Sequence, residues 1–352
     1  MLLGLSESFP SLVESKFKAA QAAKSLIFSP TELTVIRTTA GLPFQLRYCP
    51  SLAKKPTAQK NENPQMKKPD PFDNPPADLL IADVPTTNPT HLLVLNKFPI
   101  VLEHFILATK TNKPQTDQLE QDDLEVTYAC LKAWENGHAH ERSKRLFAFF
   151  NSGDHSGASQ PHRHLQFLPV ERMMNGEETS GWGLLMDQLL VTPQSITKGI
   201  SDLKQNPKLP FTHFASPLPL DPSGSQLLRT YQDLYKAATT SVNEHARSHP
   251  TDFELHSTED GSLPISYNLA MTTSAMAICP RRREGNILQR DDGSDIGFVA
   301  LNGTMLAGTL MVKYQEEWDV LRVEPKKLDT LLEAIGIPLG TEDNQGNNRN
   351  RL

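Results

Sequence analysis

The chain has 352 residues, enough for one large or two modest domains, and its 38% hydrophobic and 22% charged residues are ordinary for a globular protein. The formal net charge of -6 argues against a sequence-independent nucleic-acid binder, which normally has a basic surface, but it allows small phosphorylated ligands that need only local positive charge. The three cysteines lack C-x-x-C spacing, and neither a signal peptide nor a membrane-spanning apolar run is visible, so we expect a cytoplasmic protein with no disulfide framework, no cysteine zinc site and no membrane partner.

The first 140 residues predict a series of short elements. Ser15 to Ile27 is rich in Ala and Lys and should be helical, and Asp122 to Glu135 has apolar side chains at helical spacing. Between these helices, short runs bounded by turn residues predict strands, of which the last two should be adjacent and antiparallel: Thr34–Arg37, Phe44–Tyr48, His91–Pro99 and His104–Lys110.

Two polar segments in this region carry residues that could bind a ligand or simply face solvent. Ser51 to Pro76 is rich in Lys, Pro and Asn and should be an extended, mobile connection, in which Lys54 and Lys55 either reach a phosphate or are solvated linker charges. His138 and His140 lie among charged residues after the predicted helix. We interpret them as a solvated helix end rather than as a ligand pair.

The second half predicts further helices and strands around a Pro-rich stretch. Residues 1–340 should form a single domain in which 171–262 is a helical insertion, and the Asn-rich tail 341–352 should be disordered. The elements expected here are helices at Gly181–Leu190, Gln226–His245 and Pro325–Ile335, and two short strands within Ser266–Pro280.

The most informative stretch runs from Leu146 to Val170. It begins with an aromatic-rich strand, continues through a loop of small and polar residues, and ends in a run that alternates polar and apolar residues. Because successive strand side chains point to opposite faces, His162, His164 and Gln166 should share one face at a spacing of about 6–7 Å. Two imidazoles and an amide beside a loop that offers backbone N–H groups could hold a phosphate and attack it. The same alternation predicts an α+β core with a mainly antiparallel sheet, this strand central and helices on one side.

These residues carry a resemblance to a known family. His162 to Gln166 matches the H-x-H-x-Q motif of the transferase branch of the histidine-triad superfamily. From about Leu46 to Ile335 the chain resembles diadenosine tetraphosphate (Ap4A) phosphorylases, also called ATP adenylyltransferases, in the blocks Asn96-Lys97-Phe98-Pro99, Asn151-Ser152-Gly153, Ser156-Gly157-Ala158-Ser159-Gln160-Pro161 and Tyr267-Asn268-Leu269 with Pro280-Arg281. The resemblance implies a HIT-like fold.

The resemblance also implies a ping-pong nucleotidyl transfer. His164 would attack the α-phosphate of the dinucleotide, ATP would leave, and inorganic phosphate would take AMP from the covalent adenylyl-histidine to give ADP. Imidazole has a pKa of about 6.5, so a neutral nucleophile is available at about pH 7. His162 would support the nucleophile through its backbone carbonyl or side chain. Gln166 stands where hydrolases of the superfamily have a third histidine, and its amide can bond a phosphate oxygen but cannot act as a base towards water.

Phosphoryl-type transition states mostly need positioning and charge neutralisation, which suggests where the substrate is bound. The resemblance implies substrate contacts from the blocks above and, for the nucleoside, from the segment at and after Asn268. The expected contact residues are Lys54, Lys55, Asn96, Lys97, Asn151, Ser152, Gly157, Ala158, Ser159, Gln160, Asn268, Thr272, Thr273, Met276 and Arg281. A divalent cation such as Mg2+ should accompany the polyphosphate, held by substrate oxygens and water rather than by a protein cage. The expected partners are small molecules (dinucleoside polyphosphate, ATP, ADP and phosphate), with no nucleic acid. The oligomeric state is open.

Three other interpretations stay open. A hexose-1-phosphate uridylyltransferase shares the motif and the fold, although the zinc-type Cys/His clusters or uridine-directed pattern expected of it are not visible. A hydrolase of the same superfamily would need a base near position 166. A non-catalytic nucleotide-binding protein could keep the pocket, and covalent labelling with substrate would separate it from either enzyme.

Overall fold

An eight-stranded antiparallel sheet forms the centre of the molecule in the computed structural model, which describes residues 3–54, 69–137, 144–174, 176–190, 203–249 and 265–339. Its strands lie in the order β3 (Leu80–Val84), β4 (His91–Leu95), β5 (Phe105–Thr109), β7 (His164–Pro169), β6 (Leu146–Ser152), β9 (Ser266–Met271), β10 (Ala275–Arg281) and β8 (Phe214–Pro217). The strand that carries the histidine motif therefore lies inside the sheet, as predicted, with β5 on one side and β6 on the other.

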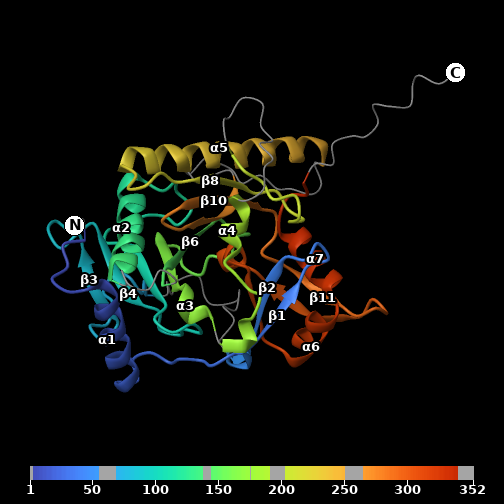
Figure 1. Cartoon of the computed structure of the whole chain (residues 1–352), viewed down its shortest axis with the longest axis horizontal. Coiled ribbons are helices and arrows are strands. Elements are labelled where there is room, and N and C mark those ends of the chain that lie inside the picture. The colour runs from blue at the N-terminus through green and yellow to red at the C-terminus, as the bar shows by residue number, and fades with distance from the viewer. Residues whose placement is uncertain are drawn as a thin grey trace.

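A smaller sheet lies beside the large one. It consists of β1 (Glu32–Arg37), β2 (Pro43–Tyr48) and β13 (Thr309–Val312), and β13 runs parallel to β2 although more than 250 residues separate them. A separate hairpin is formed by β11 (Gly285–Gln289) and β12 (Asp295–Ala300). Figure 1 shows the small sheet on the opposite side of the view from the N-terminal helix.

Helices cover both faces of the large sheet, so the expectation of helices on one side is wrong. One face packs against α1 (Phe9–Ala22), α2 (Gln121–Gly137) and α5 (Gly224–Ser248). The other packs against the small sheet, α3 (Val170–Met173), α4 (Leu185–Leu190), α6 (Gln315–Val323) and α7 (Pro325–Ile335). The reason is visible in β6, where Phe150 belongs to the first core while Phe147 and Phe149 belong to the second. A strand that is apolar on both faces needs cover on both.

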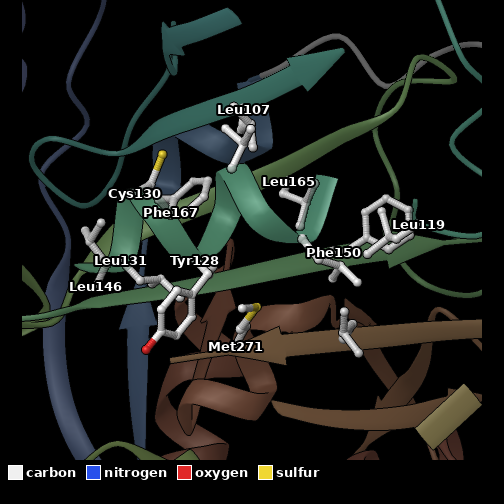
Figure 2. Close-up of a cluster of buried hydrophobic side chains, with 14 of the residues drawn as sticks. Leu107, Leu119, Tyr128, Cys130, Leu131, Leu146, Phe150, Leu165, Phe167 and Met271 are labelled. Carbon is white, nitrogen blue, oxygen red and sulfur yellow. The ribbon is translucent and has the colours of Figure 1, made fainter. Parts of the chain in front are cut away.

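The first of these cores fills the space between the sheet and α2. Figure 2 shows its side chains gathered there, with Leu165 and Phe167 of β7 and Leu131 and Tyr128 of α2 among them. The ring of Phe167 stacks on Phe105 of the neighbouring strand with a centroid separation of 4.8 Å. This packing fixes β7 from behind and leaves its polar face directed away from α2.

Most predicted elements are present with modest shifts. The first helix lies earlier than expected, at α1, because Pro10 fits its first turn, where a missing N–H costs nothing. The expected helix from Gly181 begins only at Leu185. Segment 171–262 contributes α5 but also β8, the edge strand of the large sheet, so its described part is not purely helical. Single-turn 3-10 helices lie at Pro50–Lys54, Gly176–Thr179 and Gly303–Ala307.

Some predictions fall outside the described residues, among them the helix-end pair His138 and His140 and the tail 341–352. Among the helices that the structure does describe, none has the length and apolar character needed to cross a membrane. The mixed α+β class with a large antiparallel sheet is confirmed.

Candidate active site

Alternate side chains of the central motif point to opposite faces of the sheet along β7. Leu165 and Phe167 point into the core against α2, so His164 and Gln166 face the other way. His162 lies just before the strand begins. The alternation seen in the sequence is therefore realised, and the two histidines and the glutamine lie in succession along one edge of the second face.

The ring of His164 is held in one tautomer. Its Nδ1 lies 2.8 Å from the backbone carbonyl oxygen of His162. Because a carbonyl oxygen can only accept, Nδ1 must carry the proton, and Nε2 keeps an unprotonated lone pair. Within the described parts of the chain, no hydrogen bond is made to Nε2. The geometry therefore presents His164 as a nitrogen nucleophile that needs no base.

Burial keeps this nucleophile neutral. His164 is 3% exposed, and burial lowers its pKa from 6.5 to about 4. The ring of Phe72 is tilted over it at a centroid distance of 5.3 Å, which removes much of the water that would stabilise the charged form. At neutral pH the lone pair of Nε2 is thus available in practically every molecule.

This burial predicts an unusual titration of His164. Its ring C–H resonances should shift with a midpoint near pH 4, whereas Phe72→Ala should move the midpoint upward towards 6.5, because water reaches the ring. The measurement is NMR over pH 3.5–8 (roughly), with assignment by His164→Gln. The buried His213 also has a pKa lowered to about 4, and its midpoint should not respond to Phe72→Ala. A wild-type midpoint for His164 between about 6 and 7 would contradict the burial argument.

His162 is fixed by residues that the sequence analysis did not single out. Its Nδ1 lies 2.6 Å from Oδ2 of Asp70, and its Nε2 lies 2.8 Å from the carbonyl oxygen of Thr109. Burial alone would raise the pKa of Asp70, but hydrogen bonds from the Phe72 N–H, His162 and Asn112 lower it on balance. The ring of His162 is therefore occupied on both nitrogens, while its backbone carbonyl serves His164.

Asp70 and Phe72 correct the expectation for Ser51 to Pro76. The described end of that segment is not a mobile connection, because the carboxylate of Asp70 is bonded to His162 and Phe72 packs against both histidine rings. Lys54 closes a 3-10 helix, and Lys55 lies outside the described residues, so their contact with phosphate stays a prediction.

Gln166 is linked to a further histidine. Nε2 of His104 lies 3.0 Å from Oε1 of Gln166, and the Nδ2 amide of Asn96 lies 3.2 Å from Nδ1 of His104. Gln166 remains partly exposed on the face of the sheet that it shares with His164, which we call the open face. His104 is 8% exposed. Lys97, next to Asn96, is exposed at the turn, and its Nζ lies 5.7 Å from the ring centroid of Phe98.

Gln115 joins the motif strand to the strand before it. Its Oε1 accepts from the N–H of His164 at 2.7 Å, and its Nε2 donates to the carbonyl oxygens of His164 and Asn151 at 3.1 and 2.7 Å. The side chain thus replaces the backbone pairing that stops where β6 and β7 diverge into the loop. Nothing in the sequence around Gln115 distinguishes it from any other loop glutamine.

The loop from Gly153 to Gln160 is shaped by a buried polar network. Oδ1 of Asn151 accepts from the N–H of Gly303 at 2.9 Å and from Nδ2 of Asn268 at 2.8 Å, and the same Nδ2 donates to the carbonyl oxygen of Ser156 at 2.9 Å. Arg281, fully buried, donates to Oδ1 of Asn268 and to the carbonyl oxygen of Leu301. These groups are engaged with the protein itself, so they hold the loop. Direct substrate contacts from Asn151, Asn268 and Arg281 stay predictions.

The network leaves a short stretch of backbone able to bind an anion. Ala158 and Ser159 are exposed, and the hydrogen bonds of the described residues use none of the N–H groups from Gly157 to Gln160. Gly157 has φ +75, and an added Cβ would lie 2.8 Å from that of Asn302, so glycine is required there. Ser152, the last residue of β6, is fully buried beneath the loop.

Three of the predicted contacts lie elsewhere. Asn268 is paired with Asn151, at the level of the histidines, whereas Met271 is paired with Ala148 further along the strands. Thr272 and Thr273 follow Met271, so they lie at the opposite end of the sheet, where Thr273 donates to Glu135 of α2. Met276 is fully buried in the core against the helices. The structure does not bring these residues to His164.

A buried ion cluster anchors the motif strand from behind. The guanidinium of Arg163, between the two histidines, is 3.0 Å from both Asp123 and Glu120, and Asp123 also contacts Nε2 of His91 at 2.9 Å. Arg163 is 2% exposed. The residue between the histidines therefore ties β7 to α2 and has no access to the open face.

Comparison with known proteins shows the family of the chain. Residues 4–181 match the family model of the Ap4A phosphorylase N-terminal domain. The chain belongs to the Ap4A phosphorylase family. Residues 207–338 match the ATP adenylyltransferase C-terminal domain. The predicted family and the predicted enzyme class, a nucleotidyltransferase, are thereby confirmed, and both family segments contribute strands to the one large sheet.

Relatives from Saccharomyces cerevisiae extend the match over nearly the whole chain. Protein APA1 is 29% identical over 341 residues, covering 93% of this chain and 94% of the relative. Diadenosine 5',5'''-P1,P4-tetraphosphate phosphorylase 2 is 29% identical over 346 residues, covering 95% and 96%. The crystal structure of yeast Ap4A phosphorylase Apa2 superposes with a TM-score of 0.76 at 25% identity, covering 97% of this chain and 100% of Apa2. The chain therefore has the fold of Apa2.

Proposed function

We propose that this family member is an Ap4A phosphorylase that converts Ap4A and phosphate to ATP and ADP through an adenylyl intermediate on His164. The observation that carries the proposal is the Nδ1–H bond from His164 to the His162 carbonyl, which leaves Nε2 unprotonated on the same face as Gln166. The yeast relative that bears this activity in its name, and the Apa2 crystal structures in complex with AMP and with Ap4A, support the choice of substrate.

In the first half-reaction, Nε2 of His164 forms a bond to the α-phosphorus as the bond from that phosphorus to the bridging oxygen breaks. The electron pair of the broken bond leaves with ATP, which is a good leaving group. The imidazole keeps its Nδ1 proton and becomes positively charged, so its hydrogen bond to the His162 carbonyl strengthens in the transition state. In the second half-reaction, a phosphate oxygen attacks the same phosphorus, the P–N bond breaks, and ADP leaves a neutral His164.

The chain offers donors for the charge that develops on the phosphate. The donors proposed for this role are the NH2 group of Gln166, the exposed Lys97, and the N–H groups from Gly157 to Gln160, which have no acceptor among the described residues. Preorganised donors of this kind contribute most when charge spreads over the phosphoryl oxygens. Lys54 or Lys55 would add a charge beside the leaving polyphosphate.

The described residues beside the histidines do not fit a dedicated magnesium site. Among the described residues, no group of three or more His, Cys, Asp or Glu side chains is arranged to hold a metal ion. Asp70, the carboxylate beside the histidines, is bonded to His162, Phe72 N–H and Asn112. A divalent cation would therefore arrive bound to the polyphosphate as part of the substrate, and we assign no step to it.

Gln166 favours phosphate over water as the acceptor. An amide has no titrating nitrogen, so it cannot deprotonate a water molecule, whereas phosphate arrives already anionic and needs no base. The residue at position 166 therefore favours a phosphorylase over a hydrolase. A uridylyltransferase and a non-catalytic nucleotide-binding protein remain as outcomes of the test, and a cytoplasmic location remains a prediction.

The test is product analysis of the protein with Ap4A, with and without inorganic phosphate. We expect equal amounts of ATP and ADP with phosphate, and without it one equivalent of ATP per active site together with a protein-bound AMP. Incubation with a nucleoside diphosphate hexose serves as the control for the uridylyltransferase. AMP and ATP released in equal amounts at saturating phosphate would identify a hydrolase. Absence of any product or labelled protein would identify a binding protein.

A further inference from the structure

We propose that His104 is a positioning residue for Gln166, which it orients so that the NH2 group of the amide faces the substrate phosphate. The inference rests on the proposed function of the site and assigns a role to a residue outside the H-x-H-x-Q motif. It follows from the direction of a chain of hydrogen bonds that begins at a backbone N–H and ends at Gln166.

The direction of the chain is set at its first link. The backbone N–H of Phe98 donates to Oδ1 of Asn96 at 2.8 Å. A backbone N–H can only donate, so this bond assigns Oδ1 of Asn96 and places its NH2 group on the other side. That NH2 group lies 3.2 Å from Nδ1 of His104 and 3.5 Å from Nε2, and we assign its hydrogen bond to the nearer nitrogen, Nδ1. Nδ1 of His104 is therefore an acceptor and carries no proton.

The second link transmits this direction to Gln166. A neutral imidazole with an unprotonated Nδ1 carries its proton on Nε2. Nε2 of His104 lies 3.0 Å from Oε1 of Gln166, so it donates and the amide oxygen accepts. The NH2 group of Gln166 then points away from His104, into the partly exposed face beside His164. A reversed amide would present its oxygen to an anionic phosphate, which would be repulsive.

Backbone hydrogen bonds keep the members of this hydrogen-bond chain next to one another. The N–H of Asn96 donates to the carbonyl oxygen of His104 at 3.0 Å, which closes the connection between β4 and β5. Ile106 of β5 is paired with Gln166 of β7, so His104, which directly precedes β5, lies at a level next to that of Gln166. With His104 8% exposed, water competes little for its bonds. Asn96, predicted as a substrate contact, would on this inference act through His104.

Replacement of His104 tests the inference, because two amide side chains differ in where they place an N–H. In His104→Gln the amide nitrogen reaches the level of Nε2 and can still donate to Gln166. In His104→Asn it reaches only the level of Nδ1. We expect His104→Ala and His104→Asn to slow adduct formation by about 10- to 100-fold, a loss typical of one misplaced donor, and His104→Gln to recover most of it. The measurement is rapid-quench labelling with Ap4A.

Combination with Gln166→Ala separates positioning from a structural role. If His104 acts through Gln166, then His104→Ala should slow the Gln166→Ala protein less than about threefold further. An equal slowing in both backgrounds, or equal rates for His104→Gln and His104→Asn, would overturn the inference. Melting temperatures of all variants control for folding, and the Gln and Asn variants, which both keep a polar side chain, are the matched pair.

A second measurement does not depend on activity. The 15N shifts of the His104 ring in the free protein should show a protonated Nε2 and an unprotonated Nδ1. The opposite tautomer would overturn the positioning role even in an active enzyme. Conversely, a wild-type protein with the expected tautomer that makes no adduct from Ap4A would overturn the proposed function and leave the hydrogen-bond chain established.

Discussion

Replacement of His164 by glycine is expected to lower turnover by a factor on the order of 10⁶, the loss typical of removing a catalytic nucleophile, and to abolish the covalent adduct. The reason is that Nε2 of His164 combines an unprotonated lone pair with a place on the open face beside Gln166. The measurement is incubation with α-labelled Ap4A, followed by counting of acid-labile, base-stable label on the protein. The His164→Gly protein should fold and carry none.

Two replacements serve as controls for this experiment. His162→Gly removes a ring that is bonded to Asp70 and Thr109 but keeps the carbonyl that accepts from His164, so adduct should still form at a reduced rate. His213 is a fully buried histidine whose Nδ1 likewise donates to the carbonyl two residues earlier, at 3.0 Å, and His213→Gly should lower stability without abolishing the adduct. Label that persists in His164→Gly would make His162 or His155 the nucleophile.

Local sequence patterns were sufficient to predict the strands of the sheet but not the layers that pack against its two faces. The alternation from His162 to Phe167 has a period of two, which no helix satisfies, and it set both the strand and the faces of its side chains. Leu146 to Phe150 has no such alternation, because Phe147 and Phe149 are buried on the second face as well. An unbroken apolar run does not reveal how many layers cover it, which is why helices on both faces were not predicted.

The residues that organise the site were hidden for a different reason. Asp70, His104 and Gln115 are single polar residues in segments without periodicity, and each reaches the motif through a contact that spans 49 to 92 positions of the chain. The spacing of a short motif predicts how its own residues are arranged, but it does not predict which distant residues contact them. Conversely, Asn151 and Asn268 were predicted from their motif blocks as substrate contacts, whereas in the structure their polar groups are engaged in holding the loop.

Replacement of Gln166 by histidine is expected to convert part of the phosphorolysis into hydrolysis. In the proposed mechanism, the adenylyl group on His164 is protected from water because position 166 carries no base, and a general base is typically worth about 10²–10⁴-fold, or roughly 3–5 kcal/mol of barrier. In the variant, the new imidazole can act as this base when it is neutral and its unprotonated nitrogen faces the attacking water, so that nitrogen must not be the one that accepts from Nε2–H of His104. AMP formation without phosphate should therefore rise by about tenfold or more.

The opposing possibility is that Gln166 only holds a phosphate oxygen, and Gln166→Ala distinguishes the two. Loss of the amide donor should slow both half-reactions alike, because the same phosphoryl oxygens are stabilised in each. If Gln166→His behaves as Gln166→Ala does, the choice of acceptor is not controlled at this position. AMP and ADP must be measured together in the wild type and both variants, since only their ratio separates a slower enzyme from a changed one. A wild type that makes AMP as fast as ADP at saturating phosphate would be a hydrolase, and the open face beside His164 would then have to admit a water activated by some group other than Gln166.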